Sequence, residues 1–91
     1  MKPKNIREMI HQLPRLQWAC RRGMLELDVL LGNFLKTGYP ELNDDEKCLF
    51  VKLLYTPDPE LFVWLMGTEE PDDPEMRQIV GMIRRHARAN I

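Results

Sequence analysis

The sequence has little of what usually marks an enzyme active site. It contains only five glycines in 91 residues, and they stand singly, so no phosphate-binding loop of the G-x-G-x-x-G or G-x-x-x-x-G-K type is present. Its two cysteines, Cys20 and Cys48, are isolated and form no C-x-x-C metal or redox pair. Both lie within helical apolar patterns, so we interpret them as reduced, structural thiols of a cytoplasmic protein.

The sequence also lacks a strong excess of positive or negative charge, and it has no long hydrophobic run. The formal net charge of -1 creates no long-range field toward nucleic acid or anionic lipid. The longest apolar runs, residues 49–51 and 61–66, are far shorter than the ~18 residues of a membrane-spanning helix. Arg7 and Glu8 come before any apolar stretch, which argues against a secretory signal. We therefore expect a cytoplasmic location, no nucleic-acid partner and no direct membrane insertion.

Proline and glycine divide the rest of the chain into short segments in which apolar residues recur every three or four positions. This spacing predicts an all-α fold, a compact bundle of five short helices, and 91 residues suffice for one core only. We expect a partly ordered N-terminal lead at 1–13, with a short amphipathic turn or helix, and a single helical domain at 14–91. The predicted helices cover residues 14–22, 24–36, 44–54, 58–66 and a last segment from about 73.

Several residues predict where these helices begin and end. Asn43, followed three positions later by Glu46, is typical of a capping box, and Asp58 with the proline after it repeats a cap-then-proline pattern. Gly23 is expected to end the first helix with a positive φ. Gly32, inside the second helix, costs about 1 kcal/mol relative to alanine, which we interpret as a sign of a close neighbouring helix.

Few side chains are candidates for catalysis or metal binding. His11 and His86 lie near opposite ends of the chain without a metal-ligand spacing, and we interpret them as surface histidines. The arginines after Cys20 could activate its thiol, but packing within a helix is the favoured interpretation. The acidic stretch 44–46 is explained by helix capping rather than by a metal ion. We therefore expect no catalytic residue, no metal site and no tightly bound cofactor.

Charged residues concentrate instead at one predicted helix junction, residues 18–28. Its arginines and Trp18 resemble the mixture that binds nucleic acid, but the acids Glu26 and Asp28 directly downstream would repel phosphate. A positive φ at Gly23 would expose bare backbone between Arg22 and Glu26, a guanidinium and a carboxylate suited to binding another protein. An internal salt bridge between Arg22 and Glu26 explains the same pattern equally well.

At this junction the residues resemble a known family. The run Trp18-Ala19-Cys20-Arg21-Arg22-Gly23-Met24, followed by Glu26-Leu27-Asp28, is similar to the R-G-x-x-E signature of the succinate dehydrogenase flavinylation factors of the SdhE type, also described as CptB antitoxins. Three further blocks are similar in the same order, namely Asn43 to Lys47 with Phe50 and Leu53-Leu54, then Asp58-Pro59-x-Leu61-Phe62-x-Trp64-Leu65, then Ile79-Val80 with Ile83-Arg84. The resemblance covers residues 16–85, and the long lead and Gly32 depart from it.

The resemblance implies a five-helix factor that binds the flavoprotein subunit of succinate dehydrogenase, and of fumarate reductase, and promotes covalent attachment of FAD. In that family the client protein supplies the histidine that attacks the 8α-methyl carbon of the flavin. The chain would then be a chaperone rather than an enzyme, holding no FAD tightly by itself. Contacts with the partner are implied for Arg22, Gly23 and Glu26, supported by Trp18, Arg21, Met24 and Asp28. The alternative is an antitoxin or regulator that binds a toxin or a cytoskeletal target, as the second family label suggests.

Overall fold

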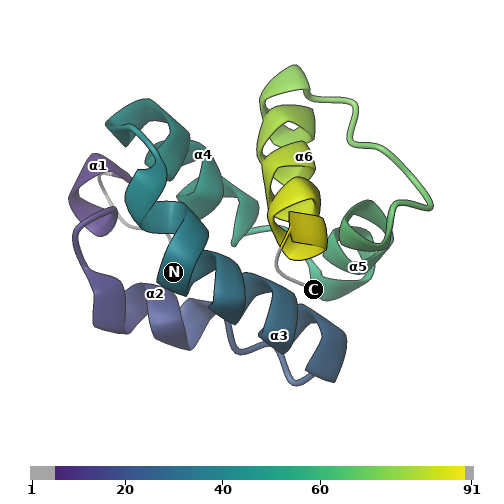
Figure 1. The fold of residues 1–91 in the computed structure, drawn as a ribbon, viewed down its shortest axis with the longest axis horizontal. Helices are drawn as coiled ribbons and strands as arrows, with labels where there is room; N and C mark the ends of the chain where they lie inside the picture. Colours follow the sequence, from purple (N-terminus) through teal and green to yellow (C-terminus); the bar gives the residue numbers. More distant parts are fainter. Residues whose placement is uncertain (1–5, 90–91) are drawn as a thin grey trace.

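Helices follow one another along the described part of the chain, residues 6–89 of the computed structural model (Figure 1). A single turn, α1 (Ile6–Met9), leads into α2 (Leu13–Ala19) and α3 (Leu25–Asn33). Helix α3 continues as the π-helical turn η1 (Phe34–Gly38) and the 3-10 turn η2 (Tyr39–Glu41), after which come α4 (Asp44–Leu53), α5 (Asp58–Met66) and α6 (Pro74–Ala89). Residues 6–89 contain no strand, so the predicted all-α bundle of short helices is confirmed.

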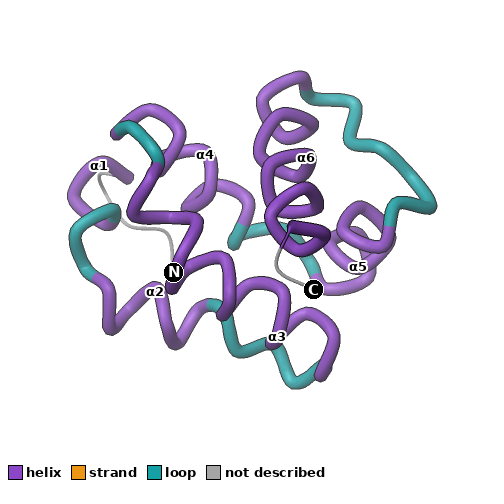
Figure 2. Tube along the Cα trace, viewed as in Figure 1, coloured by secondary structure: helices purple, strands orange, loops and turns teal. Residues whose placement is uncertain are grey.

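The longest helix, α6, organises the bundle. It packs against α3, α4, α5 and the π-turn η1, while α1 packs against α4 and α2. Figure 2 shows the result: α2 and α3 lie along one side of the molecule, and short loops join all the helices except α5 and α6, which a longer loop connects. The α2–α3 side therefore contacts the rest of the bundle on one face and solvent on the other.

The core is apolar and draws on every helix from α2 onward. Phe50 of α4 lies at its centre, with ring centroids 5.4 Å from Phe34 and 5.3 Å from Tyr39. The Tyr39 hydroxyl donates to the backbone carbonyl of Ile10 at 2.7 Å, which ties the segment after α1 to the core. Burial of these side chains supplies most of the driving force for folding. Other fully buried side chains are Leu16, Leu27, Leu31, Val51, Leu53, Leu61, Ile79, Val80 and Ile83.

The predicted helix boundaries are partly confirmed. The capping box at Asn43 is present, because the Asn43 side chain accepts from the Glu46 amide at 2.8 Å and Glu46 returns a carboxylate to the Asn43 amide at 3.0 Å. The prediction for Asp58 is wrong. Pro57 occupies the N-cap of α5, and no side chain forms a capping hydrogen bond there. The Asp58 carboxylate instead accepts a hydrogen bond from Arg22.

Gly32, the glycine inside the second predicted helix, does not behave as predicted. A Cβ added to Gly32 would meet nothing within 4 Å, so no neighbouring helix explains this glycine. The close approach occurs at Gly38, where an added Cβ would stand 2.6 Å from the Phe34 ring. Helix α3 accordingly widens into the π-turn after Asn33, which lets Phe34, Leu35 and Tyr39 all reach the core.

Within residues 6–89 every helix is too short or too polar to cross a membrane. Residues 1–5 of the predicted lead and residues 90–91 lie outside the described residues.

Candidate functional site

Residues 20–24 connect α2 to α3, and we call them the α2–α3 corner. They lie at the centre of residues 18–28, the segment that resembles the R-G-x-x-E signature. Helix α2 ends at Ala19, three residues before the predicted end, and α3 begins at Leu25. Gly23 has a φ of 82°, so the predicted left-handed conformation is confirmed. A Cβ on Gly23 would meet nothing within 4 Å, and the residue is exposed. The backbone conformation rather than packing therefore requires glycine here, and the main chain at this point is bare.

Arg22 points away from that bare backbone and into the protein. Its side chain is only 13% exposed. The Nε atom donates to Asp58 Oδ1 at 2.8 Å, one terminal nitrogen donates to the carbonyls of Ala19 at 2.9 Å and Leu54 at 2.8 Å, and the other donates to the carbonyl of Thr56 at 2.7 Å. The acidic partner of Arg22 is thus Asp58 and not Glu26. Arg22 does form an internal salt bridge, but the alternative interpretation assigned it the wrong acidic residue.

Asp28 and Met24 brace the corner from behind. The Asp28 carboxylate accepts from the backbone N–H of Arg22 at 2.6 Å, and the Asp28 amide donates to the carbonyl of Met24 at 2.9 Å. The Met24 side chain is partly buried against the core. Arg22 is consequently anchored twice, through its backbone by α3 and through its side chain by the turn before α5. This double anchor explains why α2 ends early.

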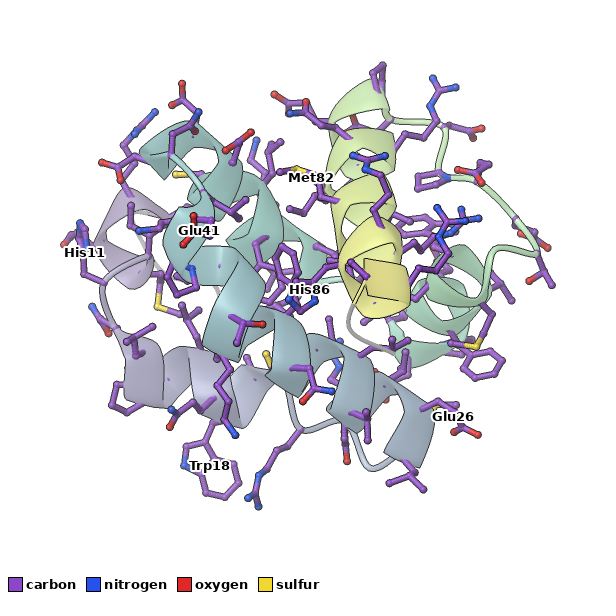
Figure 3. All side chains as sticks on the ribbon, viewed as in Figure 1. His11, Trp18, Glu26, Glu41, Met82 and His86 are labelled. Carbon is purple, nitrogen blue, oxygen red and sulfur yellow. The ribbon has the colours of Figure 1, made fainter. Side chains whose placement is uncertain are left out.

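Other residues of the segment project into solvent. Trp18 is 74% exposed, and the Arg21 guanidinium lies 5.9 Å from the centre of its ring, within cation–π range. Figure 3 shows Trp18 and Glu26 extending away from the body of the molecule on the α2–α3 side. Leu25, next to Glu26, is 76% exposed. The exposed side chains of residues 18–28 therefore include an aromatic ring, a guanidinium, a carboxylate and a leucine, on both sides of Gly23 in the sequence.

A groove of about 710 Å³ runs between α2 and the α3–η1 helix next to this corner. Its walls include Leu13 and Val29, which are exposed, and Gly32, whose missing side chain leaves the groove open. Sequence reasoning missed Leu13, Leu25 and Val29 as surface residues of interest. A signal was available for Leu25 and Val29, which fall off the inward stripe of Leu27 and Leu31, but Leu13 keeps the helical spacing to the buried Leu16 and gave none.

The structure shows the surroundings of Cys20 and of the two histidines, which were the candidates for catalysis or metal binding. Cys20 is 3% exposed, and burial raises the pKa of its thiol to about 12, although the nearby Arg22 charge lowers it in part. The favoured interpretation of Cys20 as a packed thiol is therefore supported. The prediction that His86 is a surface residue is wrong: it is half-buried, lies edge-on to Phe34 at 5.3 Å and contacts the Thr37 hydroxyl at 2.6 Å. His11 is exposed.

Comparisons with known proteins find a matching family model and several similar proteins. Residues 14–87 match the family model described as flavinator of succinate dehydrogenase. The chain is 51% identical over 75 residues to the FAD assembly factor SdhE of Shewanella oneidensis, covering 82% of this chain and 92% of that protein. It is 43% identical over 77 residues to the FAD assembly factor SdhE of Idiomarina loihiensis, covering 85% and 86%, and 47% identical over 70 residues to that of Pectobacterium atrosepticum, covering 77% and 80%.

Proposed function

The chain belongs to the family of flavinators of succinate dehydrogenase, and from that premise we propose that its α2–α3 corner is the surface on which this FAD assembly factor acts. An assembly factor of this kind promotes covalent flavinylation of the flavoprotein subunit, called the client below. The corner supplies a rigid, exposed and chemically mixed surface. The client supplies the group to which the flavin becomes attached.

The observation that carries the proposal is the bare backbone at Gly23. A left-handed glycine with open space around it allows a partner to approach the main chain more closely than any other residue would. The same exposed segment carries Trp18 and Arg21, two of the residue types that dominate binding energy in protein interfaces, and the Glu26 carboxylate. We assign direct client contacts to Trp18, Arg21, Gly23 and Glu26, while Met24 and Asp28 support the corner from behind.

The finer parts of the proposal concern cofactor, client range and location. FAD is held by the client and not tightly by this chain, which accords with a sequence free of phosphate-binding glycine loops. We propose that the chain performs no covalent step itself, and the burial of Cys20, its candidate thiol, is consistent with this. The same corner also serves the related flavoprotein subunit of fumarate reductase. A cytoplasmic location is supported by the two free cysteines.

A co-purification experiment tests the proposal. The tagged chain is expressed with the client, and both the recovered client and its covalent flavin fluorescence are measured. Wild-type chain should recover the client, whereas Gly23→Arg and Glu26→Ala should recover much less at unchanged helical content. Gln78→Arg, which adds the same side chain at an exposed position of α6, is the control and should behave as wild type. A client that is fully flavinylated in a strain lacking the chain would contradict the proposed function.

A further inference from the structure

We infer that Arg22 is a positioning residue, which shapes the corner without touching the client, and that Asp58 outside the signature is its necessary partner. This inference rests on the proposed function, because it explains how the binding surface is kept in shape. The position of Arg22 beside the exposed Gly23 suggests direct binding, but the contacts of its guanidinium argue for an internal role.

The guanidinium is almost fully occupied. Arginine has five N–H donors, and four hydrogen bonds of 2.7 to 2.9 Å already use this side chain. All four acceptors belong to this protein, and the side chain is 13% exposed. A client could gain little from a group so placed, because binding it would first require breaking internal bonds.

The acceptors show what Arg22 holds together. Ala19 is the last residue of α2, and Leu54 is the C-cap of α4, so the guanidinium lies at the carbonyl ends of two helices. A positive charge is favourable at such ends, where carbonyls lack helical partners. Asp58, in the first turn of α5, neutralises the charge on the third side. Arg22 thereby joins the ends of α2 and α4 to the start of α5.

This junction, which we call the Arg22 clamp (Arg22 with Asp58 and the carbonyls of Ala19, Leu54 and Thr56), fixes the residue just before Gly23. Glycine has wide backbone freedom, so the left-handed bend persists only if its neighbours are held. Loss of the clamp should let the corner sample other shapes. Client affinity would then fall because part of the binding energy is spent on reordering the surface.

A set of matched variants tests the inference through client affinity, measured by titration of purified chain with the client. Asp58→Ala and Arg22→Lys should each weaken binding about tenfold, because neither variant can form the complete clamp. The double variant should be little weaker than the weaker single variant, since both remove one unit. Asp58→Asn, which keeps an oxygen acceptor, should restore most of the affinity.

Two further measurements separate the clamp from general stability. The backbone amide resonance of Gly23 in the free protein should shift in Asp58→Ala and return toward its wild-type position in Asp58→Asn. Glu70→Ala removes a comparable ion pair, the 2.9 Å contact with Arg84, and should change neither client affinity nor the Gly23 resonance. Variants are compared at a temperature where thermal unfolding shows each one folded.

The outcomes distinguish this inference from the proposed function. If Arg22→Lys weakens binding while Asp58→Ala binds like wild type, Arg22 contacts the client directly and the inference is wrong. Additive losses in the double variant would also overturn it. If the wild-type chain fails to bind the client at all, the proposed function itself is wrong. Loss of binding in Gly23→Arg with normal binding in Asp58→Ala would reject the clamp and leave the proposed function standing.

Discussion

Two glycines with nearly the same backbone conformation have opposite surroundings. Gly23 has a φ of 82° and Gly67, which ends α5, has a φ of 84°. At Gly67 an added Cβ would stand 2.8 Å from an Arg84 terminal nitrogen, whereas nothing lies within 4 Å of the same point at Gly23. Each glycine has an arginine in a nearby ion pair, but Arg22 turns inward to Asp58 and leaves its glycine bare. On our proposal, a left-handed glycine serves as a binding feature where no side chain lies against it.

The largest expected effect comes from placing the same side chain at both glycines. Asparagine tolerates the left-handed region better than most residues, so Gly23→Asn should keep the fold yet weaken client binding about thirtyfold or more through obstruction of the bare backbone. Gly67→Asn should instead lower the free energy of unfolding by about 1 kcal/mol while client affinity stays unchanged. Binding titrations and denaturant unfolding of both variants check this pair. Equal loss of affinity at both sites would remove the contrast.

A smaller effect is expected from the exposed apolar residues beside each glycine. Trp18→Ala should weaken client binding about tenfold with almost no change in stability, because this ring is mostly in solvent in the free protein. Met66→Ala, next to Gly67 and also exposed, should leave affinity unaltered. Calorimetric titration together with thermal unfolding measures both quantities. Unaltered affinity in Trp18→Ala would exclude α2 from the client interface.

The last effect appears only at high pH and concerns the buried side of the Gly23 corner. Burial raises the pKa of Cys20 above its ordinary value of 9.0 to about 12, so in the unfolded chain the thiol ionises first as the pH rises. The stability that the neutral thiol contributes is complete below pH 9 and is lost between pH 9 and 12. Unfolding measured across this range should therefore decline less steeply in Cys20→Ala than in wild type. The Tyr39 pKa, also raised to about 12, contributes a background common to both.

The sequence predicted the features that depend on nearby residues. Apolar spacing placed the helices, the Asn43 capping box marked the start of α4, and glycine chemistry predicted the left-handed bend at Gly23. These signals lie within a few residues of one another, so physical rules for local structure suffice. Local glycine and charge chemistry singled out Gly23 and Glu26, whereas the family resemblance was needed to name Trp18 as a contact, and all three contacts with a client stay a prediction.

What the sequence did not predict depends on distant residues. The Arg22–Asp58 pair joins positions 36 apart in the chain, and Asp58 had a plausible local role as a helix cap that concealed its actual one. Similarly, the close approach predicted at Gly32 occurs at Gly38, where an added Cβ would stand 2.6 Å from the Phe34 ring and 3.1 Å from the His86 ring of the distant helix α6. Tertiary contacts decide such cases, and a single sequence leaves them open.

The turn between α4 and α5 is a surface loop, a class of segment that generally accepts insertions and deletions. Here the Arg22 clamp needs the carbonyls of Leu54 and Thr56 at a fixed separation from the Asp58 carboxylate. Adding or removing one residue would take at least one acceptor out of reach. The length of this turn is consequently constrained by a site on another part of the chain. A redesign of the factor for a different flavoprotein should vary the exposed residues Trp18, Arg21, Leu25 and Glu26 and keep the turn at its present length.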